Sequence, residues 1–318
     1  MIRRTPYASV DLSERATRRR SIRSCSGALR CGLLLAAVLY TAATEAQVAP
    51  GGERHRGIHA KRDMNPNSTG ATGAVAATNP NNIPYLGGPV LPNPTIYAMW
   101  WGNRADFPSD LVPGISEFFN TLNETAYLHL THQYLFGEDA QVRFGGNLFD
   151  SSAPPAQAPA TTEIVAEVCK VLDDYGRKPD SNAIYAVYTS NNPPQNIYCA
   201  FHDIGACPDG TNIHIMLSPN NNDEPLCWVQ PPELSCNRLS NGLQAAANSW
   251  AHELMETMTD PDTIDGWNNA STGNEIGDPC NFTYKRCVTL SDGHIWQLQE
   301  MWSNKVSACV QGAGNGED

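Results

Sequence analysis

The residues of this chain with the clearest chemical potential form the run Trp250–Thr257, which places a histidine and two glutamates close together. If the run is helical, His252 and Glu256 are four residues apart and project from the same face. Glu253 then lies about 100° around the helix from His252. An imidazole and a carboxylate placed in this way can hold a divalent cation, while a neighbouring carboxylate accepts a proton from water. This spacing therefore predicts metal-assisted hydrolysis.

The pattern differs at one position from the H-E-x-x-H motif, in which two histidines bind zinc and the glutamate acts as general base. Glu256 stands where that motif has its second histidine. One imidazole with two carboxylates is a harder and more anionic ligand set than two imidazoles, so the bound cation is a weaker Lewis acid. We expect His252 and Glu256 to bind Zn2+, with calcium or manganese as alternatives, and Glu253 to be the catalytic residue.

A cation needs at least three protein ligands, and the loop 273–280 is the nearest source of a third. We expect Asp278 to be this ligand. Glu275 is the second candidate, either as a ligand or as a hydrogen-bond partner of His252. His202, which stands in a Cys-x-x-His pattern, is a further alternative. The competing interpretation is an ordinary helical ion pair beside a solvated acidic loop.

The element that must position these residues is a helix that begins near Asn241 and ends at Asp260–Pro261. Asn241 and Gln244 form a plausible capping box at its start. Four apolar side chains lie nearly opposite His252 and Glu256 on such a helix: Leu243, Ala247, Trp250 and Leu254. This pattern predicts a helix that packs on one side and faces a cleft on the other.

The remainder of the chain predicts strands and further helices around this one. Strands are expected at 95–101, 141–144, 183–189, 213–217 and 295–302, and helices within 110–135 and at 161–175. The nearly apolar run 183–189 is typical of a strand in the centre of a sheet. The expected fold class is α+β and zincin-like, with a mixed sheet packed on long helices, including the helix that carries His252.

The amino-terminal sequence indicates export rather than a folded element. Residues 1–46 combine eight arginines, a short apolar run from Cys31 to Thr41 and small residues up to Ala46, which is the pattern of a signal peptide. Residues 47–89 lack periodicity and are expected to be a disordered linker or pro-segment. A single domain is expected at 90–311 and a flexible tail at 312–318. The predicted location is secreted or extracellular.

The charge of the chain excludes two classes of partner. Residues 1–46 hold 8 of the 21 basic and 3 of the 33 acidic side chains, so the remainder carries 13 and 30, a net charge near −17. A surface this acidic argues against nucleic acid and anionic membranes as partners. We find no hydrophobic stretch of membrane length outside the signal segment.

The cysteines predict a domain held by disulfides. Of ten cysteines, eight lie beyond the signal segment, and an even number in an exported chain is typical of a disulfide framework. Short spacings favour three local pairs and one long closure, although eight cysteines allow 105 pairings. The expected pairs are Cys199–Cys207, Cys227–Cys236, Cys280–Cys287 and Cys169–Cys309.

Several stretches in a common order resemble the EXORDIUM / phosphate-induced-protein family of secreted proteins. The residues that carry the resemblance are Ile96–Gly102, Ile184–Ser190, Cys199–His202, Ala251–Glu256, Gly266–Trp267, Glu275–Cys280 and Gln299–Ser303. The match spans about residues 93–310. It implies an extracellular or cell-wall location, and the family supplies no established biochemical activity.

Two functions are compatible with these observations. The first is a secreted zinc-dependent hydrolase, most simply a peptidase-like enzyme that acts on a peptide or a cell-wall substrate. The second is a non-catalytic extracellular or cell-wall-associated protein that holds a structural cation or none. The sequence contains no G-x-S-x-G motif, no P-loop and no unpaired cysteine outside the signal segment that would favour another mechanism.

Overall fold

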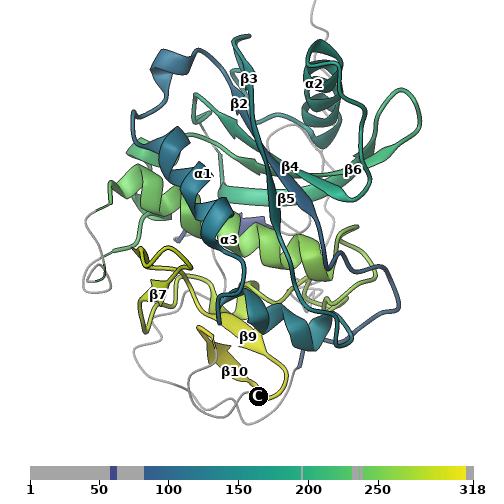
Figure 1. Ribbon diagram of the computed structural model, residues 1–318, viewed down its shortest axis with the longest axis vertical. Coiled ribbons are helices and arrows are strands. Elements are labelled where there is room, and N and C mark those ends of the chain that lie inside the picture. Colours follow the sequence, from purple (N-terminus) through teal and green to yellow (C-terminus); the bar gives the residue numbers. More distant parts are fainter. Residues whose placement is uncertain (1–57, 63–81, 195, 231–235, 237–238, 313–318) are drawn as a thin grey trace, which may run out of the picture. The chain divides into compact units, whose positions relative to one another are not determined.

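A six-stranded mixed sheet is the central element of the computed structural model, which describes residues 58–62, 82–194, 196–230, 236 and 239–312. Its strands are β1 Ile58–Ala60, β2 Thr95–Trp101, β3 Arg143–Asp150, β4 Ala183–Thr189, β5 Tyr198–Ala206 and β6 Asn212–Ser218. The strand order is β1-β5-β6-β4-β2-β3. Strands β2 to β6 of this sheet are labelled in Figure 1. Strands β3, β2, β4 and β6 are parallel, whereas β5 and β1 are antiparallel additions at one edge. The predicted α+β class with a mixed sheet is confirmed.

Three α-helices within the described residues cover the two faces of this sheet: α1 Leu111–Thr121, α2 Thr161–Asp174 and α3 Asn241–Thr259. Helix α1 connects β2 to β3, and α2 connects β3 back across β2 to β4. Right-handed crossovers that run in opposite directions along a sheet place their helices on opposite faces. The buried hydrophobic residues form two main clusters that fit this arrangement. One cluster contains side chains of α1 and α3, and the other contains side chains of α2.

Strand β4 shows how the sequence divides between these two faces. All seven of its residues are buried, as expected for an interior strand. Ile184, Ala186 and Tyr188 belong to the cluster with α1 and α3, whereas Ala183, Tyr185 and Val187 belong to the cluster with α2. Successive side chains point to opposite faces of a strand, so a nearly continuous apolar run supplies both cores.

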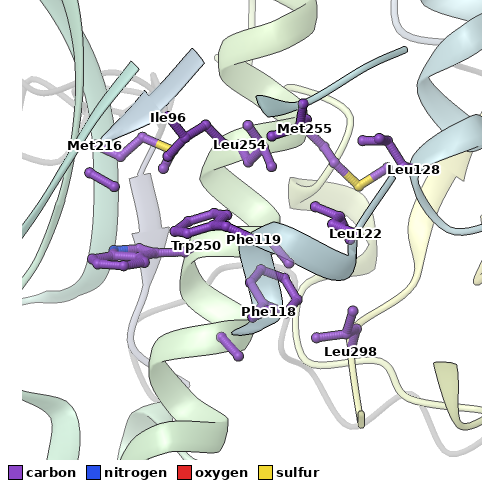
Figure 2. Close-up of a cluster of buried hydrophobic side chains, with 14 of the residues drawn as sticks. Ile96, Phe118, Phe119, Leu122, Leu128, Met216, Trp250, Leu254, Met255 and Leu298 are labelled. Carbon is purple, nitrogen blue, oxygen red and sulfur yellow. The ribbon is translucent and has the colours of Figure 1, made fainter. Parts of the chain in front are cut away.

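Helix α3 is buried along almost its whole length, from Gly242 to Thr259. Figure 2 shows Trp250 and Leu254 of this helix among side chains of the sheet and of α1. The indole of Trp250 lies 5.5 Å from the Phe119 ring and 5.9 Å from the Trp100 ring. The apolar face predicted from the helical spacing is therefore the face that anchors α3 to the sheet.

The carboxyl-terminal region is less regular than the sequence predicts. A single strand at 295–302 is wrong, because β8 Ile295–Trp296 and β9 Met301–Ser303 are separate. Between them the backbone of Gln297 and Gln299 hydrogen-bonds to side chains of α3 instead of to a neighbouring strand. Strand β7 Val288–Thr289 pairs with β8, and β10 Ala308–Val310 pairs with β9. The 3-10 helices are η1 Arg104–Asp106, η2 Leu128–Tyr134, η3 Asn221–Asp223, η4 Pro225–Cys227 and η5 Asp278–Cys280.

Strand β1 lies inside the segment 47–89, for which the sequence predicts no structure. Residues 58–60 pair with the edge of β5, and His59 is fully buried. The expectation of a disordered linker is therefore wrong for residues 58–62. A strand of three residues is too short to show periodicity, and its pairing with β5 stabilises it.

The predicted signal segment 1–46 and most of the tail at 312–318 lie outside the described residues. In the part of the chain that the structure describes, no helix is long and apolar enough to cross a membrane.

All eight cysteines of the domain form disulfides, but every predicted pair is wrong. The disulfides are Cys169–Cys207, Cys199–Cys227, Cys236–Cys287 and Cys280–Cys309. The prediction favoured the shortest loops, whereas the fold pairs cysteines that packing brings together. Each disulfide joins residues 28 to 51 positions apart.

Candidate functional site

One face of α3 carries a stripe of polar side chains at four-residue intervals: Gln244, Asn248, His252 and Glu256. All four are at most 1% exposed. Burying polar groups in this way is costly unless each finds a partner. The partners of this stripe define the site.

The first two residues of the stripe, Gln244 and Asn248, form hydrogen bonds to the segment that follows β8. Both the Gln244 and Asn248 side chains donate to the Gln297 carbonyl, at 2.7 and 2.8 Å. The Asn248 oxygen accepts the Gln299 N–H at 3.0 Å. Gln299 is thereby placed with its side-chain nitrogen 2.8 Å from His252 Nδ1. The stripe thus provides an amide partner that orients the His252 ring.

The orientation of the Gln299 amide is linked to the tautomer of His252. As assigned, the amide nitrogen donates to Nδ1 and also lies 3.3 Å from the Gly277 carbonyl. A cation bound at Nε2 requires Nδ1–H to donate to the amide oxygen, which is the opposite orientation of the same group. Either arrangement keeps the ring in place and leaves Nε2 directed at the carboxylates.

The last two residues of the stripe, His252 and Glu256, contact the acidic loop before η5. Glu256 Oε1 accepts the Gly277 N–H at 3.0 Å, and the Ile276 carbonyl accepts the Trp302 N–H at 2.8 Å. A Cβ atom at Gly277 would lie 2.8 Å from atoms of Glu256 and His252, so this close approach requires glycine. The disulfide Cys280–Cys309 closes the end of the loop.

Strand β5 contributes His202 from the opposite side. Its Nδ1 lies 2.9 Å from Glu253 Oε2, and its Nε2 lies 3.6 Å from Glu275 Oε1. The neighbouring Phe201 belongs to the cluster on the α2 face, so strand alternation directs His202 toward α3. His202 is only an alternative ligand in the sequence-based prediction, whereas in the structure it lies against Glu253 and Glu275.

The predicted ligands come together, but in two neighbouring groups that share Glu256. His252 Nε2 lies 3.1 Å from Glu256 Oε2 and 3.7 Å from Asp278 Oδ1. Glu275 is instead next to His202, whose Nδ1 is 3.8 Å from Glu256 Oε2. In each of the sets His252–Glu253–Glu256 and His202–Glu256–Glu275, one potential ligand atom per residue lies within 4.8 Å of the others.

His59 of β1 is the member of the site that sequence reasoning missed. Its ring stacks on that of His252, with centroids 4.4 Å apart and planes 10° apart. Its backbone N–H donates to Glu253 Oε1 at 3.2 Å. No local pattern marks His59, because it stands in a basic segment without periodicity. The residue type, a histidine, was therefore the one feature of the sequence that could have suggested a place for His59 in the site.

Burial and mutual charge perturb the pKa values of the whole cluster. Burial alone would lower the pKa of His252, but Glu256 and the other carboxylates raise it to about 9. His202 is affected in the same way, and Glu275 raises its pKa well above the ordinary value against the effect of burial. Burial raises the pKa of Glu253, Glu275 and Asp278, and repulsion from Glu256 adds to this effect. Without a cation, protons must neutralise this cluster.

The atoms that face one another across the cluster fit a divalent cation. His252 Nε2, His202 Nε2, Glu256 Oε2 and both Glu275 oxygens are buried without a hydrogen bond among the described residues. Imidazole nitrogen and carboxylate oxygen are ligand types that zinc and manganese accept. His252 Nε2 lies 3.1 Å from Glu256 Oε2, and His202 Nε2 lies 3.6 Å from Glu275 Oε1. Separations of this size fit two ligand atoms that are each about 2 Å from a shared cation.

Among the described residues, exposure to solvent differs between Asp278 and the other members of the cluster. The side chain of Asp278 is 15% exposed, whereas those of His202, His252, Glu253 and Glu256 are fully buried. The face toward β1 is closed by the His59 ring.

Comparisons of this chain with models of protein families, with curated proteins and with solved structures find no match.

Proposed function

We propose that this protein is a secreted metal-dependent hydrolase whose site is the buried His/Glu cluster of α3, β5 and the loop before η5. The observation that carries the proposal is the clustering of two histidines and four carboxylates, in which His202 Nε2, His252 Nε2, Glu256 Oε2 and both Glu275 oxygens are buried without a hydrogen bond among the described residues. Such a cluster destabilises a fold unless it is neutralised, and a cation neutralises it best.

His252, Glu256 and Asp278 are the residues that would hold the catalytic cation. A bound divalent cation supplies Lewis acidity toward a carbonyl oxygen and makes water more acidic. The proposal takes Asp278 rather than Glu275 as the partner of His252, because Asp278 Oδ1 lies 3.7 Å from His252 Nε2 whereas Glu275 Oε1 lies 3.6 Å from His202 Nε2. Zn2+ is the proposed cofactor, and manganese is the alternative that the carboxylate-rich set favours.

In this proposal Glu253 acts as the general base. It follows His252 on the helix, its Oε2 lies 2.9 Å from His202 Nδ1, and its Oε1 accepts one backbone N–H. Burial raises the pKa of Glu253, and a carboxylate with a higher pKa is a stronger base. In this assignment His202 is a positioning residue, because it fixes the carboxylate that receives the proton.

Two features support an extracellular setting. The four disulfides are typical of a chain that folds in an oxidising compartment, and the amino-terminal sequence resembles a signal peptide. The zincin-like fold and membership of the EXORDIUM family remain proposals that rest on the ordered motifs. A peptide is the favoured substrate class, with a cell-wall component as the alternative.

A metal analysis combined with one conservative substitution tests the proposal. We expect stoichiometric zinc or manganese in purified protein and cleavage of a peptide library once the segment Ile58–Arg62 has been released from the cluster, with Glu253→Gln retaining the metal and losing at least a hundredfold in rate. Glu138→Gln is the matched control, since Glu138 is an exposed glutamate in the segment that follows η2. Absence of stoichiometric metal, or an active Glu253→Gln variant, would refute the assignment.

The enclosure of the cluster favours a second candidate, a non-catalytic protein with a structural cation. Of the residues placed in the cluster, Asp278 has the most exposed side chain. Closed sites with a full set of protein ligands are typical of structural metal centres. Metal that is bound stoichiometrically in a protein that cleaves neither peptides nor esters, even after the segment Ile58–Arg62 is released, would support this candidate.

A further inference from the structure

The segment Ile58–Arg62, here called the strap, lies along the edge of β5 as an added strand. Ile58 aligns with Phe201 and His59 with Ala200 in antiparallel register, and the pairing becomes irregular after His59. Beyond the strand, Lys61 N–H donates to the Ile197 carbonyl at 3.0 Å. The strap thus pairs with β5 through its backbone, as an extended peptide does when it binds to an open sheet edge.

The strap crosses the candidate site at His59. Its N–H donates to Glu253, the proposed base, and its ring covers His252, the proposed ligand. The Phe282 ring lies on the other side, 5.0 Å from the imidazole. A group in the position of His59 therefore separates the catalytic side chains from solvent on this face of the cluster.

The two residues after the strand, Lys61 and Arg62, are basic, and each contacts a defined partner on the domain. Lys61 Nζ pairs with Glu224 Oε2 at 2.5 Å, and both side chains are largely buried. The Arg62 guanidinium lies 4.4 Å from the centre of the Phe282 ring and donates to the Trp228 carbonyl. Asp223 and Glu224 line a cavity that also includes Lys61. The surface beside β5 is thus built to receive positive charge.

Charge distinguishes the strap from the domain that it contacts. Residues 54–62 hold four basic and no acidic side chains, whereas residues 47–318 as a whole have a net charge near −17. Opposite charge favours the encounter of such a segment with the groove. The strap is also separated in sequence from β5 by more than 130 residues, so its removal breaks no local connection.

We propose that the edge of β5 above the His/Glu cluster is a binding groove for an extended polypeptide with basic residues, and that the strap is its built-in occupant. The peptide adds a strand to β5, places one residue over His252 and Glu253, and directs the next cations to Glu224 and Phe282. The inhibitory consequence rests on the proposed function, because a strap in this position blocks substrate from the base. The binding of peptide to the groove does not depend on that function.

The experiment uses the full chain with a site-specific protease sequence introduced between Arg62 and Asn82 and cut after folding. The probe is a fluorescent synthetic peptide with the sequence of residues 56–64, followed by anisotropy in the presence of chelator. A tethered strap competes at an effective concentration near millimolar. We therefore expect the peptide to bind the cut chain at least tenfold more tightly than the intact chain, and a peptide with glutamate in place of Lys61 and Arg62 to bind at least tenfold more weakly.

A variant of the intact chain gives a second reading that needs no cleavage. Lys61→Glu places like charges together at Glu224, so the strap is weakened and the probe should bind at least tenfold more tightly than to the parent chain. Lys178→Glu, a charge reversal at an exposed position outside the groove, should leave binding unchanged. Circular dichroism confirms that each variant is folded.

The outcomes separate this inference from the proposed function. Equal probe binding to cut and intact chains, or no binding to either, overturns the groove and makes the strap an ordinary structural strand. Binding without any hydrolysis of peptides after the strap is released supports the groove and refutes the hydrolase. Hydrolysis by the cut chain that the probe peptide cannot inhibit supports the hydrolase and refutes the groove.

Discussion

Removal of the disulfide Cys280–Cys309 should weaken metal binding as well as stability. This disulfide closes the loop that carries Glu275 and Asp278. It spans 29 residues, and the loop-entropy relation gives a loss of about 3.6 kcal/mol when it is replaced by two alanines. The remaining restraints on the loop are hydrogen bonds, each of which contributes about 1 kcal/mol.

The matched control is the disulfide Cys169–Cys207. It joins α2 to the end of β5 on the other face of the sheet, and its 38-residue span gives a loss of about 3.9 kcal/mol by the same relation. The two double variants should therefore have similar free energies of unfolding. Only the variant at 280 and 309 frees a ligand of the cluster.

The assay is urea unfolding together with zinc competition against a chelating dye. We expect both variants to lose stability to within about 1 kcal/mol of each other. Zinc affinity should fall about 10–100-fold in the Cys280→Ala/Cys309→Ala variant, the range seen when support for a metal ligand is lost. It should be unchanged in Cys169→Ala/Cys207→Ala. Equal zinc affinity in the two variants would refute the role of the loop.

Three further outcomes follow from the same geometry. Trp250→Ala should lower the free energy of unfolding by about 3–5 kcal/mol in urea titrations, because it empties a fully buried site at the centre of the core. Gly277→Ala should weaken zinc binding in the dye assay and cost about 1–3 kcal/mol, since its Cβ meets Glu256 and His252 at 2.8 Å. Metal-free protein should lose stability as pH rises: the folded pKa of His252 is about 9, above the unfolded value of 6.5, so its contribution of roughly 3 kcal/mol is complete below pH 6.5 and is lost toward pH 9. The raised carboxyl pKa values of Glu275 and Asp278 act in the same direction, and thermal melts of zinc-loaded protein should lack this decline.

The elements with strong local patterns were predictable from the sequence. The runs at 95–101 and 183–189 are apolar and β-branched over seven residues, and they form β2 and β4 with those bounds. Helix α3 follows from its apolar spacing, although its N-cap is Ser240, which accepts from Leu243 N–H, and not the predicted Asn241. Local preferences and burial agree in these segments, so the pattern is sufficient.

The candidate site was predictable only where it is helical. The spacing of His252, Glu253 and Glu256 fixes their relative directions on α3 without further information. The pairing of Glu275 with His202 depends on how a loop and β5 approach that helix. The positions of these residues in the sequence do not determine the distance between them in the fold. The polar stripe that continues to Gln244 and Asn248 was a usable signal, since four polar residues at four-residue intervals seldom occupy a buried face without partners.

The cluster was expected to face a cleft, and instead it is enclosed. The sequence could not show this, because the cover comes from His59, 193 positions before His252. The disulfide pairs were mispredicted for a related reason. Loop length ranks pairs by the entropy of closure, whereas the observed pairs depend on which elements pack together.

The contact between His59 and Glu253 joins residues 194 positions apart, and this separation has a consequence for the order of events during synthesis. At about 5–20 residues per second, the strap is made roughly 10–40 s before the helix that it covers. The groove therefore cannot exist before its occupant does. In the proposed hydrolase the site would be covered from the moment it forms, and it would first open only when the strap is removed.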